Sequence, residues 1–135
     1  MSQTNELEIM ERIALDLERV EESLASSFNT GAEDFNALIR PLSAAGGKRL
    51  RAQLCLLIAN AGTSIERQRI KIAEAVEMLH LATLIHDDVL DQAEIRRGED
   101  TIHMHKGNKV AILSGDYLFA KAFKIVSEMT NMKYL

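Results

Sequence analysis

The chain has 135 residues, enough for one modest domain, and its 47% of hydrophobic residues can form a buried core. Aromatic residues make up only 4% and there is a single proline, a composition that favours helices over sheets. A net charge of −4 implies no nucleic-acid partner, and the lone cysteine, Cys55, excludes a disulfide framework within the chain.

The N-terminal segment MSQTNELEIMERI is polar and acidic, unlike a signal peptide. No apolar run approaches the ~20 residues that a membrane span requires. Cys55 lies inside an apolar run, which fits a reducing compartment. The sequence therefore predicts a soluble, cytoplasmic protein.

The first half of the chain predicts three helices. Apolar residues at steps of three and four indicate an amphipathic helix over about residues 5–28: Met10, Ile13, Leu17, Val20 and Leu24. A short helix is predicted over about residues 32–38, because Pro41 limits its continuation. The glycine pair at 46–47 then predicts a hinge that opens a buried helix, which stops near Gly62.

The second half predicts two longer helices. Ser64 is the predicted N-cap of a helix over about residues 64–90, which is apolar on most of its circumference and so belongs in the middle of a bundle. Residues 94–108 predict a polar loop, and Val110 to about Met129 another apolar helix. No convincing strand pair is found, so the predicted fold class is all-α.

The end of the chain predicts an incomplete domain. The segment FAKAFKIVSEMTNMKYL is helix-like up to Leu135, with no glycine or proline stop. We therefore expect residues 1–135 to form a single partial domain, cut from a longer helical bundle.

A polar line is predicted along the central helix. At about 100° per residue, Asp91 lies about 40° from Asp87, and His80 about 20° away on the other side. Carboxylates four residues apart repel each other unless a cation lies between them, and oxygen ligands without cysteine favour Mg²⁺. Asp88 points about 100° away and ranks lower as a ligand. The alternatives are a solvated helix end and a hydrogen-bonded core histidine.

Two basic clusters accompany this line. Lys48 and Arg51 share a helical face beside the glycine pair, where free backbone N–H groups suit a phosphate or diphosphate. Arg96 and Arg97 follow the aspartates directly. Either cluster alone is typical of a solvated basic helix end. Together with the aspartates they indicate two anion sites that flank a metal site.

These residues together resemble the trans-type polyprenyl diphosphate synthases (isoprenyl diphosphate synthases). The match consists of GGKRLR, EMLHLATLIHDDVLDQAEIRRG and GNKVAILSGDYLFAKAF, in the family's order and spacing from about Gly46 to Phe123. DDVLD matches the first aspartate-rich motif, DDxxD. The resemblance implies a helical bundle that is the N-terminal portion of the isoprenoid synthase fold. One departure is Ala52, where the family usually has proline.

The resemblance also implies a reaction. Asp87 and Asp91 would bind Mg²⁺ that bridges to an allylic prenyl diphosphate, and Arg96 would contact the same diphosphate. Four residues would bind the diphosphate of isopentenyl diphosphate: Lys48, Arg51, His80 and Arg97. Ionisation of the allylic C–O bond, attack by the double bond of isopentenyl diphosphate and loss of a proton would lengthen the prenyl chain by five carbons. Metal and guanidinium charges suit a leaving diphosphate.

Product length is implied by the residues before DDVLD, where bulky aromatics in the family stop elongation early. Ala82 and Thr83 are the fifth and fourth residues before Asp87, and neither is aromatic. We therefore expect a medium- or long-chain product, with Val76 and Leu79 lining a deeper tunnel. The alternative is that small residues merely permit close helix packing.

The largest departure from the family is length, since its members run to roughly twice this size, as one enlarged bundle. The second aspartate-rich motif has no counterpart after Asp91, and Asp116 is more typical of a structural hydrogen-bonding residue. We therefore expect this chain to be a truncated form, inactive alone, that associates as a homodimer. A natural short subunit completed by a partner chain is the alternative. A terpene cyclase ranks last, since Lys48, Arg51 and His80 would have no purpose there.

Overall fold

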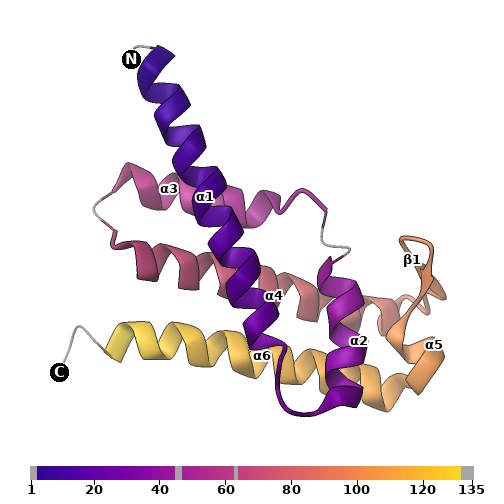
Figure 1. Ribbon diagram of the computed structural model, residues 1–135. Coiled ribbons are helices and arrows are strands. Elements are labelled where there is room, and N and C mark those ends of the chain that lie inside the picture. The colour runs from indigo at the N-terminus through magenta and orange to yellow at the C-terminus, as the bar shows by residue number, and fades with distance from the viewer. Residues whose placement is uncertain (1–2, 45–46, 63, 132–135) are drawn as a thin grey trace.

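The computed structural model describes residues 3–44, 47–62 and 64–131, and over these ranges the all-α prediction is confirmed (Figure 1). The helices and strands are α1 (Gln3–Ser27), α2 (Glu33–Ala44), α3 (Leu50–Ala61), α4 (Glu66–Leu90), β1 (Ile95–Arg96), β2 (Glu99–Asp100), α5 (Ile102–Lys106) and α6 (Asn108–Asn131).

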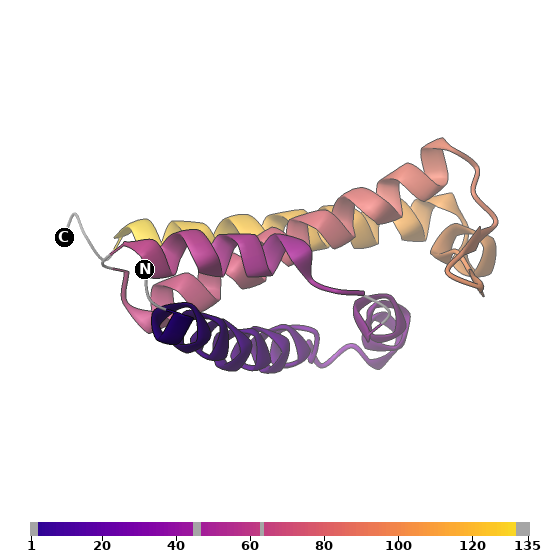
Figure 2. The same cartoon turned by 90° about the horizontal axis from the view of Figure 1, so that it is seen from above.

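Helix α4 is the centre of the arrangement, because α1, α3 and α6 all pack against it. Figure 1 shows α6 running alongside α4, while α1 passes diagonally across α3 and α4. The short helix α2 lies across the direction of α4 and α6, and Figure 2 shows it almost end-on. The hairpin and α5 lie at the end of α4 where the sequence places the aspartates.

The core follows the helical periodicity of the sequence. On α1, Ile13, Val20 and Leu24 are buried, whereas Met10 is 61% exposed although it belongs to the same apolar series. The adjacent Ile9 is partly buried against the core instead, so at this level of α1 the side chain of Met10 lies on the solvent side of the helix. On α4, Ala73 and Ala82 are fully buried, because small side chains let neighbouring helices approach closely.

Three buried carboxylates join α1, α3 and α4 to one another. Asp16 of α1 accepts hydrogen bonds from Arg69 of α4 at 2.6 and 3.1 Å, and one from Asn60 of α3 at 3.3 Å. Glu74 of α4 accepts hydrogen bonds from two α1 serines and from a neighbouring lysine: Ser23, Ser27 and Lys71. The third carboxylate, Glu77 of α4, accepts hydrogen bonds from residues at the start of α3. Buried charge of this kind is tolerated only where it is paired.

Asp16 makes the stability of the fold depend on pH in the acidic range. Burial alone would raise the pKa of Asp16, but hydrogen bonds from Arg69 and Asn60 and the charge of Arg69 lower it. Its contribution is therefore complete above the ordinary carboxyl pKa of 3.8 and is lost as the pH falls below that value. We expect Asp16→Asn to cost about 2 kcal/mol of unfolding free energy at pH 7.

The cost of Asp16→Asn should shrink as the pH falls below 3.8, because the unfolded chain then takes up a proton that the native carboxylate resists. Urea unfolding of both proteins across this range measures it. Glu11→Gln, an exposed change on the same helix, is the control. A cost that does not vary with pH would contradict the assignment.

Two predictions about helix boundaries are wrong, and a third lies partly outside the described residues. Helix α2 continues through Pro41 to Ala44 and accommodates the proline on its exposed side. Ser64 does not cap α4, whose N-cap position is Ile65. The Ser64 hydroxyl instead donates to the Ala59 carbonyl at 2.7 Å, so it closes α3. The predicted hinge falls partly on Gly46, which lies outside the described residues, while Gly47 has φ 64°.

The predicted loop over residues 94–108 is also wrong in part, because it contains an antiparallel hairpin and α5. Ile95 pairs with Asp100, and Arg96 with Glu99. Arg97 and Gly98 connect the strands with φ values of 53° and 84°, and positive φ at both central residues is what the favoured two-residue hairpin turn requires.

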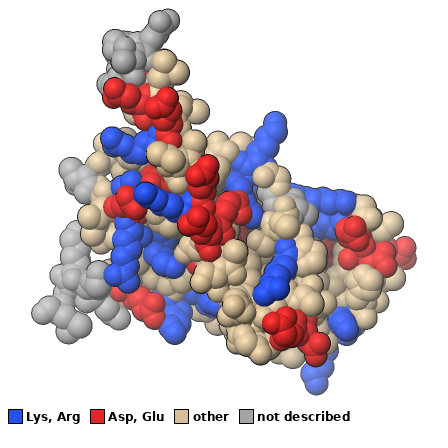
Figure 3. Space-filling view, in the orientation of Figure 1, with Lys and Arg blue, Asp and Glu red and all other residues tan. Residues whose placement is uncertain are grey.

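The surface adds two observations. Figure 3 shows acidic and basic side chains mixed on the face that α1 crosses, so this face carries no large patch of a single charge. Within the described ranges, every helix is too short or too polar to cross a membrane.

Candidate diphosphate and metal site

Asp87 and Asp91 lie at the C-terminal end of α4, and both side chains are exposed. Asp91 is the C-cap residue, and its N–H donates to the Asp87 carbonyl at 2.8 Å. This backbone bond keeps both aspartates on the last turn of the helix. Two carboxylates fit Mg²⁺, which typically takes one or two protein carboxylates and completes its shell with substrate phosphates and water. In the described part of the chain, no cluster of three or more His, Cys, Asp or Glu forms a candidate metal site.

Asp88 points to the other side of α4 and is buried, with 5% of its surface exposed. It accepts three hydrogen bonds from the guanidinium of Arg96, at 2.6, 2.8 and 2.9 Å. The hydrogen bonds from Arg96 to Asp88 raise the pKa of Arg96 against the effect of burial, and the charges of Asp87 and Asp91 add to this. The structure therefore places Arg96 beside all three aspartates and anchors it to the middle one.

The basic residues gather around His80, which is half-buried on α4. Burial lowers the pKa of His80 most, and the positive charges of Arg51, Arg97 and Arg96 lower it further against the effect of Glu77. Guanidinium groups from the start of α3 and from the hairpin therefore act on one imidazole. With its pKa lowered, His80 is a neutral hydrogen-bonding group at pH 7 rather than a cation.

Lys48 lies in the loop before α3, next to the residue that approaches the hairpin. The nearest atoms to a Cβ built on Gly47 are the two terminal nitrogens of Arg97, at 3.6 and 3.8 Å. The hairpin and the loop between α2 and α3 therefore touch at this point. Lys48 follows Gly47 directly and is exposed.

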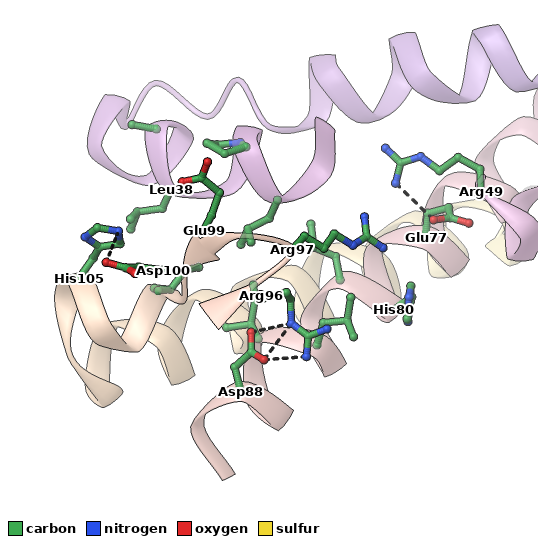
Figure 4. A pocket seen from close by; sticks show the side chains of 17 residues that line it. Leu38, Arg49, Glu77, His80, Asp88, Arg96, Arg97, Glu99, Asp100 and His105 are labelled. Atoms are coloured by element: carbon green, nitrogen blue, oxygen red, sulfur yellow. Dashed lines mark hydrogen bonds and ion pairs between the residues drawn. The ribbon is translucent and has the colours of Figure 1, made fainter. Parts of the chain in front are cut away.

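A cavity of about 220 Å³ lies between α2, the end of α4, the hairpin and α5 (Figure 4). Of the predicted site residues, His80, Arg96 and Arg97 line it. The other four do not: Lys48, Arg51, Asp87 and Asp91. In Figure 4, Arg97 points along the cavity towards Arg49 and His80, and Arg96 turns to Asp88.

The rest of the lining was not predicted. Its walls are mainly aliphatic, from α2, α4 and α5: Leu38, Leu42, Leu81, Leu84, Ile85 and Ile102. Arg49 and Glu77 lie at one end and are joined by an ion pair of 3.3 Å, while the His105 ring lies 3.8 Å from the Asp100 carboxylate at the other. The sequence signal for Arg49 and Glu77 is weak, because the two residues are 28 positions apart and no local pattern pairs them.

The small residues before the aspartates have different environments. Ala82 is fully buried within the helix packing, so a larger side chain there would disturb the core. Thr83 is exposed, and its hydroxyl donates to the His80 carbonyl at 2.7 Å. Val76 and Leu79 are half-buried. The residue that borders the exposed aspartates is therefore Thr83, whereas Ala82 serves close packing.

Comparison with known proteins gives a consistent result. The family model for polyprenyl synthetase matches residues 32–135. The chain is 33% identical over 133 residues to solanesyl diphosphate synthase 1, chloroplastic, of Arabidopsis thaliana, which covers 94% of this chain and 33% of that protein. It is 32% identical over 127 residues to octaprenyl diphosphate synthase of Escherichia coli K12, with 94% and 39% covered.

A solved structure agrees with these relatives. The polyprenyl synthase from Caulobacter crescentus CB15, complexed with calcium and isoprenyl diphosphate, superposes with a TM-score of 0.83 at 36% identity, covering 93% of this chain and 38% of that one. The chain spans about a third of the length of the curated relatives it matches.

Proposed function

Because the chain belongs to the polyprenyl synthetase family, we propose that it carries the isopentenyl diphosphate site and one metal-binding aspartate pair of a prenyltransferase. The reaction is condensation of isopentenyl diphosphate with an allylic prenyl diphosphate. The observation that carries the proposal is that His80, Arg96 and Arg97 line one cavity at the end of α4 that bears Asp87 and Asp91, where the charge of Arg51 also acts on His80.

Each side chain has a role in this proposal. Lys48, Arg51 and Arg97 supply positive charge for the diphosphate of isopentenyl diphosphate, and neutral His80 supplies a hydrogen bond. Asp87 and Asp91 hold Mg²⁺, which when bound neutralises the allylic diphosphate as a leaving group. Arg96, fixed by Asp88, adds a positive charge on the same side.

The product is proposed to be a medium- or long-chain trans-polyprenyl diphosphate. Names of similar proteins, solanesyl and octaprenyl diphosphate synthases, support this length. So does Thr83, a small exposed residue where an aromatic ring would obstruct the path along α4.

We further propose that the chain alone does not turn over and that its partner is a second copy. Asp87 and Asp91 are open to solvent, so water would capture a carbocation formed beside them. Apolar residues exposed on α3 and α6 offer surface for association: Leu54, Leu57, Ile58, Leu113 and Phe123.

Two measurements test the proposal. Calorimetric titration with inorganic pyrophosphate, without metal, should show binding that Arg97→Gln weakens about tenfold, the effect of one lost hydrogen bond to a charged group. Asp87→Asn and Asp91→Asn should leave this binding intact and remove its enhancement by Mg²⁺. Incorporation of labelled isopentenyl diphosphate, with Mg²⁺ and an allylic primer, should be undetectable for the isolated chain.

Arg67→Gln is the matched control, since Arg67 is an exposed arginine at the opposite end of α4. Equal loss of pyrophosphate binding in Arg67→Gln and Arg97→Gln would contradict the site. Appreciable turnover by the isolated chain would contradict the proposed inactivity.

A further inference from the structure

Arg49 has an unusual backbone conformation between two proposed diphosphate ligands. Its φ and ψ are 49° and 39°, in the left-handed region that side chains other than glycine rarely adopt. It is also the N-cap residue of α3, and its side chain makes no capping hydrogen bond. Interactions elsewhere must hold it in place.

Those interactions join Arg49 to three other helices. Its guanidinium donates to both carboxylate oxygens of Glu21 on α1, at 2.5 and 3.1 Å, to the Ser43 carbonyl on α2 at 2.6 Å, and to Glu77 on α4 at 3.3 Å. Burial alone would lower the pKa of Arg49, but the two glutamates raise it. Four of the five guanidinium N–H groups are thus engaged within the protein.

Glu77 completes the arrangement from α4. Its second carboxylate oxygen accepts the N–H of Ala52 at 3.0 Å, in the first turn of α3. Ala52 is fully buried, so this carboxylate replaces the cap that Arg49 does not provide. One buried side chain therefore fixes both Arg49 and the start of α3.

Lys48 and Arg51 are held by this arrangement although neither belongs to it. Lys48 precedes Arg49, and Arg51 lies between Arg49 and Ala52, so both backbones are fixed while both side chains stay exposed. Glu77 is also one helical turn before His80 on α4. The same residue thus sets the position of α3 relative to His80.

We propose that Arg49, Glu77 and Glu21 form a clamp that positions Lys48 and Arg51 for a diphosphate, and that Arg49 itself is not a diphosphate ligand. This inference rests on the proposed function. It makes Glu77 a positioning residue whose loss weakens anion binding, although its negative charge, which acts on His80, opposes an anion. Simple electrostatics predicts the opposite result, namely that removing the negative charge of Glu77 would strengthen anion binding.

Titration of the chain with inorganic pyrophosphate separates these two expectations. Glu77→Gln should raise the dissociation constant about fivefold to tenfold, because glutamine cannot accept from both Arg49 and Ala52 through two oxygens. Arg49→Lys should raise it similarly, although the charge is kept, because an ammonium cannot reach acceptors on three helices at once.

Glu74→Gln is the matched control. Glu74 is a fully buried glutamate on the same helix and undergoes the same charge change, but it contacts Ser23, Ser27 and Lys71 instead of the loop. It should change the dissociation constant less than twofold. Amide hydrogen exchange at Ala52, followed by NMR, should become faster in Glu77→Gln and remain unchanged in Glu74→Gln.

The outcomes distinguish the clamp from the function. A wild-type chain that does not bind pyrophosphate overturns the proposed function and the clamp together. Wild-type binding that stays equal or becomes tighter in both Glu77→Gln and Arg49→Lys overturns the clamp alone. If Glu77→Gln does not fold, Arg49→Lys decides the question by itself.

Discussion

Asp88→Ala is expected to lower the free energy of unfolding by about 2 to 3 kcal/mol, slightly less than the roughly 3 to 5 kcal/mol typical of breaking a fully buried ion pair. The buried carboxylate accepts three hydrogen bonds from Arg96, and its removal leaves the guanidinium without that partner. Because the Arg96 side chain is 31% exposed, water compensates part of the loss. Urea unfolding at pH 7 measures the effect.

Asp87→Ala is the natural control for this change. Asp87 is the adjacent aspartate but is exposed, so its removal should change stability by no more than about 0.5 kcal/mol. The double change Asp88→Ala with Arg96→Ala should be less harmful than the two single costs added together, because it leaves no unpaired charge. Equal effects of Asp87→Ala and Asp88→Ala would show that the ion pair with Arg96 does not stabilise the fold.

Gly115→Ala is expected to cost about 2 kcal/mol, although alanine is ordinarily the better helix former. A Cβ at this position of α6 would lie 2.2 Å from Nε2 and 2.4 Å from Cδ2 of His86. The His86 ring cannot retreat freely, since Nε2 is 3.0 Å from the Ile112 carbonyl and the ring packs against Phe119 with centroids 5.5 Å apart. Thermal or urea unfolding measures the loss.

His86→Ala tests the cause of this loss. In that background the space beside Gly115 is empty, so adding Gly115→Ala should cost little or should stabilise α6. A Gly115→Ala cost that is the same with and without His86 would show that the clash does not determine it. Because His86 directly precedes Asp87, the same contact also fixes the end of α4 that carries the aspartates.

What the sequence could predict was governed by local periodicity. The burial of α1 and α4 followed from apolar spacing, and the sharing of one α4 face by His80, Asp87 and Asp91 followed from helix geometry. Met10 departed from its series because Ile9, one residue earlier, takes the place against the core, a choice that apolar spacing alone does not decide.

The remaining features depend on contacts between distant segments. Asp88 meets Arg96 across 8 residues, and Arg49 meets Glu21 and Glu77 across 28 residues in each direction. Ser64 is a residue type that commonly caps helices, but its hydroxyl donates to the Ala59 carbonyl of the preceding helix instead. The hairpin could have been found from Gly98, yet Arg97 at positive φ is an uncommon residue for such a turn.

The buried carboxylates between α1 and α4 also bear on the order of folding. Asp16 pairs with Arg69 across 53 residues, and Glu74 with Ser23 across 51. A half-docked α1 would leave one of these charges dehydrated without its partner, an arrangement more costly than either the docked or the separated state. The two helices should therefore associate in a single cooperative step. This step closes the intervening segment as one loop, and α2 and α3 can then pack against helices that are already in place.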